Sequence, residues 1–113
     1  MGCATSETDE PHWTPEMEMV VRLESTLQIK NVLDGSLIPL SVYARYYTGT
    51  TVDGRRTVRG FFLAAGGYGI TPGIRILPES EWPQGGNDGG CTYVWIEYDV
   101  ELDRMHYQCS GVS

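Results

Sequence analysis

Two Asp-Gly dipeptides constrain the fold of this chain more than any other feature. Asp34-Gly35 and Asp53-Gly54 each lie between segments in which apolar and polar residues alternate. Asp-Gly suits the positive φ angles of a type I′ turn, and alternation is typical of strands with one buried face. The two dipeptides therefore predict consecutive antiparallel hairpins.

The first strand is expected at residues 17–29, where most odd positions are apolar and most even positions are polar. A helix is the alternative, because Thr14 and Pro15 form a typical helix start. On a helix, however, Glu24 and Gln28 would share the face of the apolar residues and leave no wide apolar stripe. We therefore predict a strand.

The alternation also predicts a register for the first hairpin. With Leu33 and Ser36 closing the turn, Ile29 faces Leu40, and inward residues of the two strands meet all along the hairpin. A slip of one residue would turn the apolar side chains of one strand to the other face. The second turn then brings residues 58–63 back beside 44–49, with Phe61 and Leu63 pointing inward, which predicts a three-stranded meander.

Two cysteines near the end of the chain predict a disulfide across a further hairpin. Cys91 and Cys109 begin and end a pair of expected strands at residues 91–98 and 104–109. In the chain-entropy model, closing a loop of this size stabilises a domain by about 3 kcal/mol. The bridge would therefore supply a large share of the stability of a domain this small.

Placing the two cysteines opposite each other predicts which side chains share a face of this hairpin. Tyr93 then faces Tyr107, and Trp95 faces Met105, so that the bridge and an aromatic column lie on one face. The reverse face would carry the remaining residues of the pair, namely Val94, Ile96, His106 and Gln108.

Together these elements predict one all-β domain at residues 16–113, an antiparallel β-sandwich or partly open barrel of about six or seven strands. A short strand at residues 74–77 precedes a glycine-rich connection at 78–90. Residues 1–15 are polar and acidic and are expected to form a flexible tether.

The charge of the chain argues against some classes of partner. The formal net charge is -7, and nucleic-acid binding requires clustered basic residues. The one basic cluster, Arg45 with Arg55, Arg56 and Arg59, is interpreted as a solvated face. We therefore expect no nucleic-acid partner.

The N-terminus carries a third cysteine in a context that suggests lipidation. Gly2-Cys3 followed by a polar, acidic stretch resembles the start of bacterial envelope lipoproteins as a class. That resemblance implies a lipid attached to Cys3 and a place in the periplasm, at the outer membrane or outside the cell. Myristoylation of Gly2 with palmitoylation of Cys3 is a second possibility, and an incidental cysteine is a third. A disulfide favours the bacterial lipoprotein over the cytosolic myristoylated protein, because disulfides are rare in the cytosol.

No motif predicts catalysis, a cofactor or a metal. The two histidines, His12 and His106, lack metal ligands at the usual spacings, and no nucleophile elbow occurs. The glycine-rich stretch at 64–73 has neither the lysine nor the helix of a phosphate-binding loop. The acidic turn at 97–103 lacks the glycine and the terminal glutamate of a calcium loop, so we interpret it as a solvated turn.

A group of four aromatic side chains and one arginine is the best candidate for a binding surface. Three of its members, Tyr43, Arg45 and Tyr47, lie on the outward face of the second expected strand, and Tyr68 and Trp82 lie in the glycine-rich segments. The predicted function is therefore a non-catalytic envelope or secreted module that binds a protein or a glycan. Alternatives are a small inhibitor of a secreted hydrolase that presents the 78–90 loop, and a subunit of an extracellular filament or shell. The sequence leaves the oligomeric state open.

Overall fold

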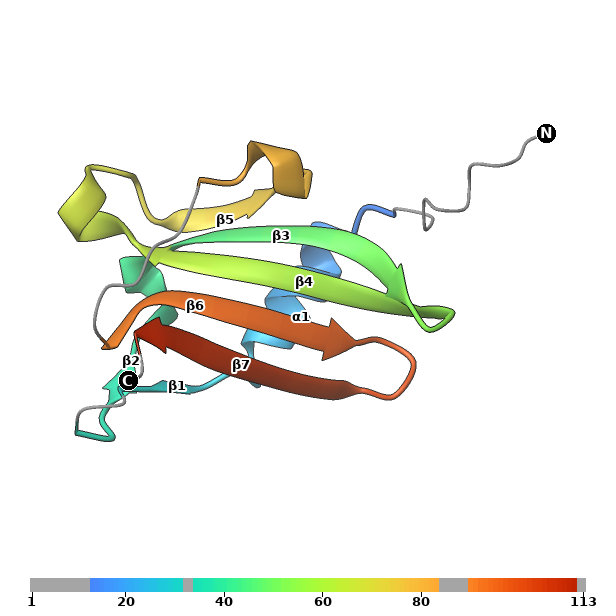
Figure 1. Cartoon of the computed structure of the whole chain (residues 1–113), viewed down its shortest axis with the longest axis horizontal. Coiled ribbons are helices and arrows are strands. Elements are labelled where there is room, and N and C mark those ends of the chain that lie inside the picture. The colour runs from blue at the N-terminus through green and yellow to red at the C-terminus, as the bar shows by residue number, and fades with distance from the viewer. Residues whose placement is uncertain (1–12, 32–33, 84–89, 112–113) are drawn as a thin grey trace.

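The computed structural model describes residues 13–31, 34–83 and 90–111 (Figure 1). Over these residues the chain forms one α-helix, seven strands and three single-turn 3-10 helices. They are α1 (Met17–Glu24), β1 (Ile29–Lys30), β2 (Leu37–Ile38), η2 (Leu40–Val42), β3 (Tyr43–Val52), β4 (Arg55–Ala64), η3 (Ala65–Tyr68), β5 (Gly73–Ile76), η4 (Glu79–Glu81), β6 (Gly90–Asp99) and β7 (Arg104–Gly111).

The strands form two sheets that do not close into a barrel. The larger sheet has the strand order β5-β3-β4-β6-β7, in which β5 runs parallel to β3 and the other neighbours are antiparallel. β1 and β2 form a separate two-stranded sheet. The predicted all-β fold with six or seven mainly antiparallel strands is therefore confirmed, in an open, sandwich-like form.

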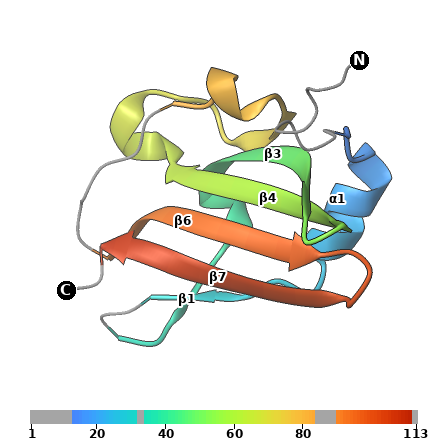
Figure 2. The ribbon, with the colours of Figure 1, turned by 45° about the vertical axis from the view of Figure 1, so that its right-hand side comes forward.

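The two faces of the large sheet differ in how they are covered. β1 lies beside β7 in both Figure 1 and Figure 2, and α1 lies behind the sheet in Figure 1. The main core forms there, from residues of α1, β1 and the sheet: Val20, Leu23, Leu27, Ile29, Tyr43, Tyr47, Val58, Phe62, Cys91, Val94, Ile96 and Cys109. The opposite face carries a smaller cluster, which Ile70, Leu77 and Trp82 partly cover.

The strand predicted at residues 17–29 is wrong, because this segment begins with the helix α1. The helix ends at Glu24, so Gln28 is not on it and the apolar stripe needs only two buried residues, Val20 and Leu23. Glu24 does point toward the sheet, where its carboxylate contacts the Arg45 guanidinium and the Tyr47 hydroxyl instead of apolar side chains. A short helix thus avoids the conflict that argued against a helix of four turns.

The register predicted for the first hairpin is also wrong. Ile29 pairs with Ile38 rather than with Leu40, and the ladder between β1 and β2 covers only two residues on each side. Pro39 follows directly, has no N–H to donate to a ladder, and leads into η2. The chain therefore leaves β2 after Ile38 and enters the large sheet as β3.

The second Asp-Gly turn behaves as predicted. Asp53 and Gly54 have φ angles of 54° and 77°, as a type I′ turn requires. Ala44 pairs with Leu63 in the predicted register, and Leu63 is buried like Phe61. The short strand expected at 74–77 is present as β5.

The C-terminal hairpin and its disulfide are confirmed, but the register differs from the prediction. Cys91 and Cys109 are bonded, yet Val94 is the residue that pairs with Cys109. A bulge between Gly90 and Val94 absorbs the difference. Cys109 pairs with Val94 instead of Cys91, which is a shift of three residues. Because a shift by an odd number of residues exchanges the two faces of a strand, Trp95 lies on the face opposite the one predicted.

The described chain begins with a segment packed on the sheet. The indole N–H of Trp13 donates to the backbone oxygen of Thr50 at 2.8 Å, and the Arg56 guanidinium lies 5.5 Å from the ring centre. Pro15 is fully buried. Of the tether expected at 1–15, residues 13–15 thus contact the domain, and Cys3 and His12 lie outside the described residues.

Candidate functional site

Two tyrosines of the predicted binding surface belong to the core instead. Tyr43 and Tyr47 are 1% and 0% exposed, because the odd positions of β3 face α1 and β3 lies inside the sheet. Arg45 lies on the same face and is mostly buried. The side chain of Tyr68 lies outside the described part of the chain. The predicted surface is therefore not assembled on β3.

Arg45 and Tyr47 form a largely buried polar cluster with Glu24. The Tyr47 hydroxyl donates to Glu24 Oε2 at 2.8 Å, and Arg45 Nε lies 3.1 Å from the same oxygen, oriented for an ion pair rather than a hydrogen bond. Burial raises the pKa of Glu24 against the opposing effects of these two partners. Burial, reinforced by the neighbouring carboxylate, also raises the pKa of the Tyr47 hydroxyl, which remains the donor. The cluster joins the end of α1 to β3.

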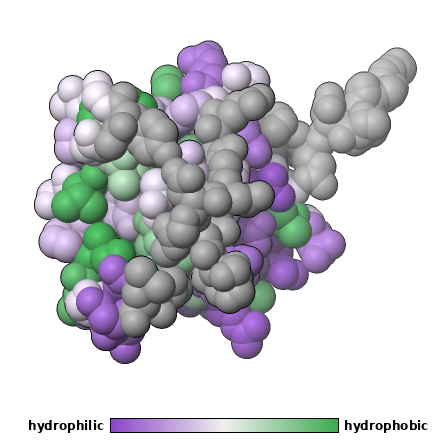
Figure 3. All heavy atoms as spheres, turned by 60° about the vertical axis from the view of Figure 1, so that its left-hand side comes forward, coloured by the Kyte–Doolittle hydropathy of each residue, from purple (hydrophilic) through white to green (hydrophobic). Residues whose placement is uncertain are grey.

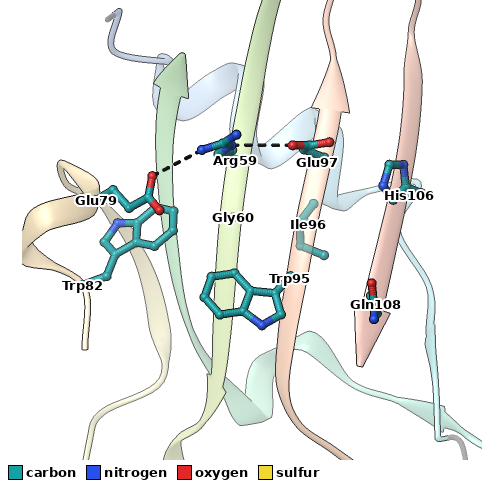
Figure 4. A pocket seen from close by; sticks show the side chains of 9 residues that line it. All are labelled: Arg59, Gly60, Glu79, Trp82, Trp95, Ile96, Glu97, His106 and Gln108. Atoms are coloured by element: carbon teal, nitrogen blue, oxygen red, sulfur yellow. Dashed lines mark ion pairs between the residues drawn. The ribbon is translucent and has the colours of Figure 1, made fainter. Parts of the chain in front are cut away.

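The opposite face of the sheet carries a hollow that is open to solvent. No helix or strand lies in front of β6 and β7 in Figure 1. The hollow has a volume of about 300 Å³ and lies between two tryptophans, Trp82 and Trp95. Figure 4 shows its polar rim, which consists of Arg59, Glu79, Glu97, His106 and Gln108. We call this site the tryptophan hollow.

Contacts between aromatic rings hold the tryptophans in place. The ring centroid of buried Phe61 lies 4.5 Å from that of Trp95, in a tilted pair, and 6.3 Å from that of Trp82, in a stacked pair. Tyr93 stacks on the same Phe61 ring with a centroid distance of 5.9 Å. The indole N–H of Trp82 donates to the Leu77 backbone oxygen at 3.0 Å. Trp95 remains 44% exposed, and its indole N–H has no hydrogen-bond partner among the described residues. The hollow thus presents rigid aromatic surface to solvent.

The charged groups beside the tryptophans form ion pairs that share one arginine. Arg59 lies 3.6 Å from a carboxylate oxygen of Glu79 on one side and 3.6 Å from one of Glu97 on the other. All three side chains are about half exposed, and exposed pairs of this length contribute about 0–1 kcal/mol to stability. Their hydrogen-bonding groups are therefore available to a ligand.

The hollow combines one predicted residue with several that the sequence analysis assigned elsewhere. Trp82 was predicted as a binding residue and lies in the wall. Trp95 was expected to face Met105 and instead lies opposite Gln108, while Glu97 lies opposite His106. The sequence did contain a signal, because polar residues occupy alternate positions of both strands. Glu97 and Asp99 lie on the same face of β6 as Trp95, and the polar residues of β7, Arg104, His106 and Gln108, also share one face. These alternating polar residues identify the solvent-exposed face of the hairpin.

A second exposed apolar area lies elsewhere on the molecule. Figure 3 shows hydrophobic residues gathered at the left of the view, on the end of the molecule that faces the viewer. β1 and β2 lie at this end, and Leu37 and Val42 are 57% and 42% exposed.

Comparisons with protein-family models, curated proteins and solved structures found no match to this chain. Among residues 13–31, 34–83 and 90–111, no group of three or more candidate ligands could hold a metal ion. No helix in these ranges is long and apolar enough to cross a membrane. The tryptophan hollow is thus the feature from which function is argued.

Proposed function

We propose that this protein is a non-catalytic module that binds a glycan in the tryptophan hollow, in the cell envelope or outside the cell. The observation that carries the proposal is the placement of exposed Trp95 and fixed Trp82 beside hydrogen-bonding polar side chains on an open sheet face. Of the two ligand classes expected from the sequence, protein or glycan, this arrangement favours the glycan.

Aromatic faces and sugar rings are complementary in charge distribution. The face of an indole ring is electron-rich, and the C–H groups on one side of a pyranose carry partial positive charge. The hydroxyl groups around the ring edge both donate and accept hydrogen bonds. Arg59 can donate to them, Glu79 and Glu97 can accept, and Gln108 can do both. Since Arg59 offsets one of the two carboxylates, only one excess negative charge remains, and the hollow does not select a strongly charged ligand.

The pairing of the carboxylates supports binding rather than catalysis. Glycoside hydrolysis uses two carboxyl groups with different tasks, one donating a proton and the other acting as base or nucleophile. Here Glu79 and Glu97 both pair with Arg59, from opposite sides. This arrangement suits hydrogen bonding to hydroxyl groups better than proton transfer.

The location in the proposal depends on the cysteines. A bond between Cys91 and Cys109 supports an oxidising compartment, such as the periplasm or the exterior. A lipid on Cys3 would then hold the domain at a membrane. The intact mass of the protein from its native host tests both points, because it reports an acyl group on Cys3 and the two hydrogens lost on forming the bridge.

Affinity electrophoresis tests the binding function. The wild type is expected to be retarded in native gels containing hydroxyethyl cellulose or glycol chitin, and Trp95→Ala is expected to migrate as in a gel without polysaccharide. Leu37→Ala is the control, because Leu37 is equally apolar and exposed but lies on β2. Circular dichroism verifies that all variants are folded. Migration of the wild type unchanged in every polysaccharide gel, together with no signal on a glycan array, would contradict the proposal.

A second candidate function is favoured by the edge of the large sheet. β7 is one of the two outer strands of this sheet, so within the described chain its outer edge has no strand partner. Such an edge can accept a strand from a neighbouring molecule, as in a filament or shell. Light scattering after size exclusion tests this alternative, and a monomer at millimolar concentration would count against it.

A further inference from the structure

We propose that the ligand is a linear, neutral β-1,4-linked oligosaccharide that lies lengthwise along β6 and fills two adjacent sites rather than one. This inference rests on the proposed glycan-binding function and specifies its ligand. It follows from a second hollow on the same open face, which we call the turn hollow.

The turn hollow continues the tryptophan hollow toward the β6–β7 turn. It has a volume of about 230 Å³, and Glu97 and His106 line both hollows. These two residues face each other across β6 and β7. The remaining wall includes Thr57 from β4, Asp99 from β6 and, beyond the strands, Leu102. The two hollows therefore form one groove that the Glu97–His106 pair divides.

The length of this groove exceeds one sugar ring. Trp95 lines the first hollow and Asp99 the second, and four residues of strand span roughly 13 Å. Along one face of a strand, side chains recur at every second residue. A straight β-1,4-linked chain has a comparable flat, repeating form, so its units can lie over successive side chains of β6.

The side chains of the turn hollow suit a hydroxyl-rich unit. Leu102 is 50% exposed and offers an apolar surface at the far end. The Asp99 carboxylate is held by Arg55 Nε at 2.7 Å and by the Leu102 backbone N–H at 2.9 Å. The side chain of Arg104 has no ion-pair or hydrogen-bond partner in the described part of the chain, so its guanidinium can donate to a ligand. The lining of the turn hollow contains two arginines and two carboxylates, namely Arg55, Arg104, Glu97 and Asp99. Their charges balance, which favours a neutral chain over a charged one.

Calorimetric titration with oligosaccharides of defined length tests the inference. Glucose and N-acetylglucosamine and their β-1,4-linked trimers are the probes, and the two series distinguish a plain from an acetamido-substituted chain. We expect the trimer of the better series to bind at least about tenfold more tightly than its monosaccharide, as one further filled site would give. Arg104→Ala and Leu102→Ala should each remove most of that gain and leave monosaccharide affinity unchanged. Trp95→Ala should abolish binding of both lengths.

Two results would overturn the inference, and they are distinguishable. Equal affinities for monosaccharide and trimer, unchanged by Arg104→Ala and Leu102→Ala, would confine the ligand to the tryptophan hollow and leave the proposed function standing. No binding of either series by the wild type would reject the β-1,4-linked ligand, and the glycan array then decides whether the proposed function fails as well.

Discussion

The indole ring of Trp13 lies directly on the backbone of Gly49. A Cβ atom at Gly49 would come within 2.7 Å of two ring carbons and would also collide with the Trp13 backbone oxygen. Gly49 has an ordinary negative φ, so the requirement for glycine here is space and not backbone conformation. The contact fixes the point where the N-terminal segment joins the sheet.

Gly49→Ala is therefore expected to lift residues 13–15 from the sheet. Overpacking of this kind costs about 1–3 kcal/mol, and the loss should appear in urea denaturation. Limited proteolysis should cut near Trp13 faster than in the wild type. Gly66→Ala is the matched control, because a Cβ there meets no atom within 4 Å. Equal stability and equal cleavage of the two variants would show that the close contact does not hold the segment.

The Cys91–Cys109 bond is expected to stabilise the domain as a whole. It closes a loop with a sequence separation of 18 residues, for which the chain-entropy model gives about 3 kcal/mol. Cys91 also accepts, through its backbone oxygen, a hydrogen bond from the buried Tyr43 hydroxyl at 2.6 Å. Urea denaturation with and without reductant measures the contribution, and Cys91→Ser/Cys109→Ser should match the reduced wild type. Identical midpoints for oxidised and reduced protein would contradict this role.

Local sequence rules predicted those parts of the fold that depend on a turn. Asp53-Gly54 determined the β3–β4 register, and the cysteines located the β6–β7 hairpin. The bulge before Val94 is invisible in the alternation of the sequence, because both faces of β6 carry apolar residues. The bulge is the reason that Trp95 lies on the face of the hairpin opposite the one predicted.

The helix shows a different limit of sequence reasoning. Glu24 counted against a helix because a carboxylate on the core side is costly unless it has partners. Its partners, Arg45 and Tyr47, come from β3, about twenty residues further along the chain. Only the tertiary arrangement reveals that they surround Glu24, so no local pattern could have predicted α1 from this residue.

Glu24 should make the stability of the domain depend on pH in a direction unusual for a carboxylate. Its pKa is raised in the folded state, chiefly by burial, so the folded protein binds the proton more tightly than the unfolded chain does. Its contribution is fully present below the unfolded value near 4.5 and is lost as pH rises through the raised folded value. Glu24→Gln mimics the protonated form, so its stability relative to the wild type should increase from pH 4 to pH 8. Glu18→Gln, on the exposed face of the same helix, is the control, and parallel curves for both variants would contradict the prediction.

Asp99 should act in the opposite direction. The hydrogen bond from Arg55 Nε at 2.7 Å, followed by that from the Leu102 N–H, holds the pKa of this carboxyl below its usual 3.8. A lowered folded value means that the ionised form stabilises the fold above pH 3.8, and that this contribution is lost as pH falls through the lowered value. Asp99→Asn should therefore lower the thermal midpoint at pH 7 and differ little from the wild type at pH 2. Asp103→Asn, in the same turn but bonded to Tyr98 instead of Arg55, separates this pair from a general effect of turn charge. A deficit of Asp99→Asn that stays constant from pH 7 to pH 2 would assign the loss to the turn hydrogen bond to Leu102 rather than to the ionised pair with Arg55.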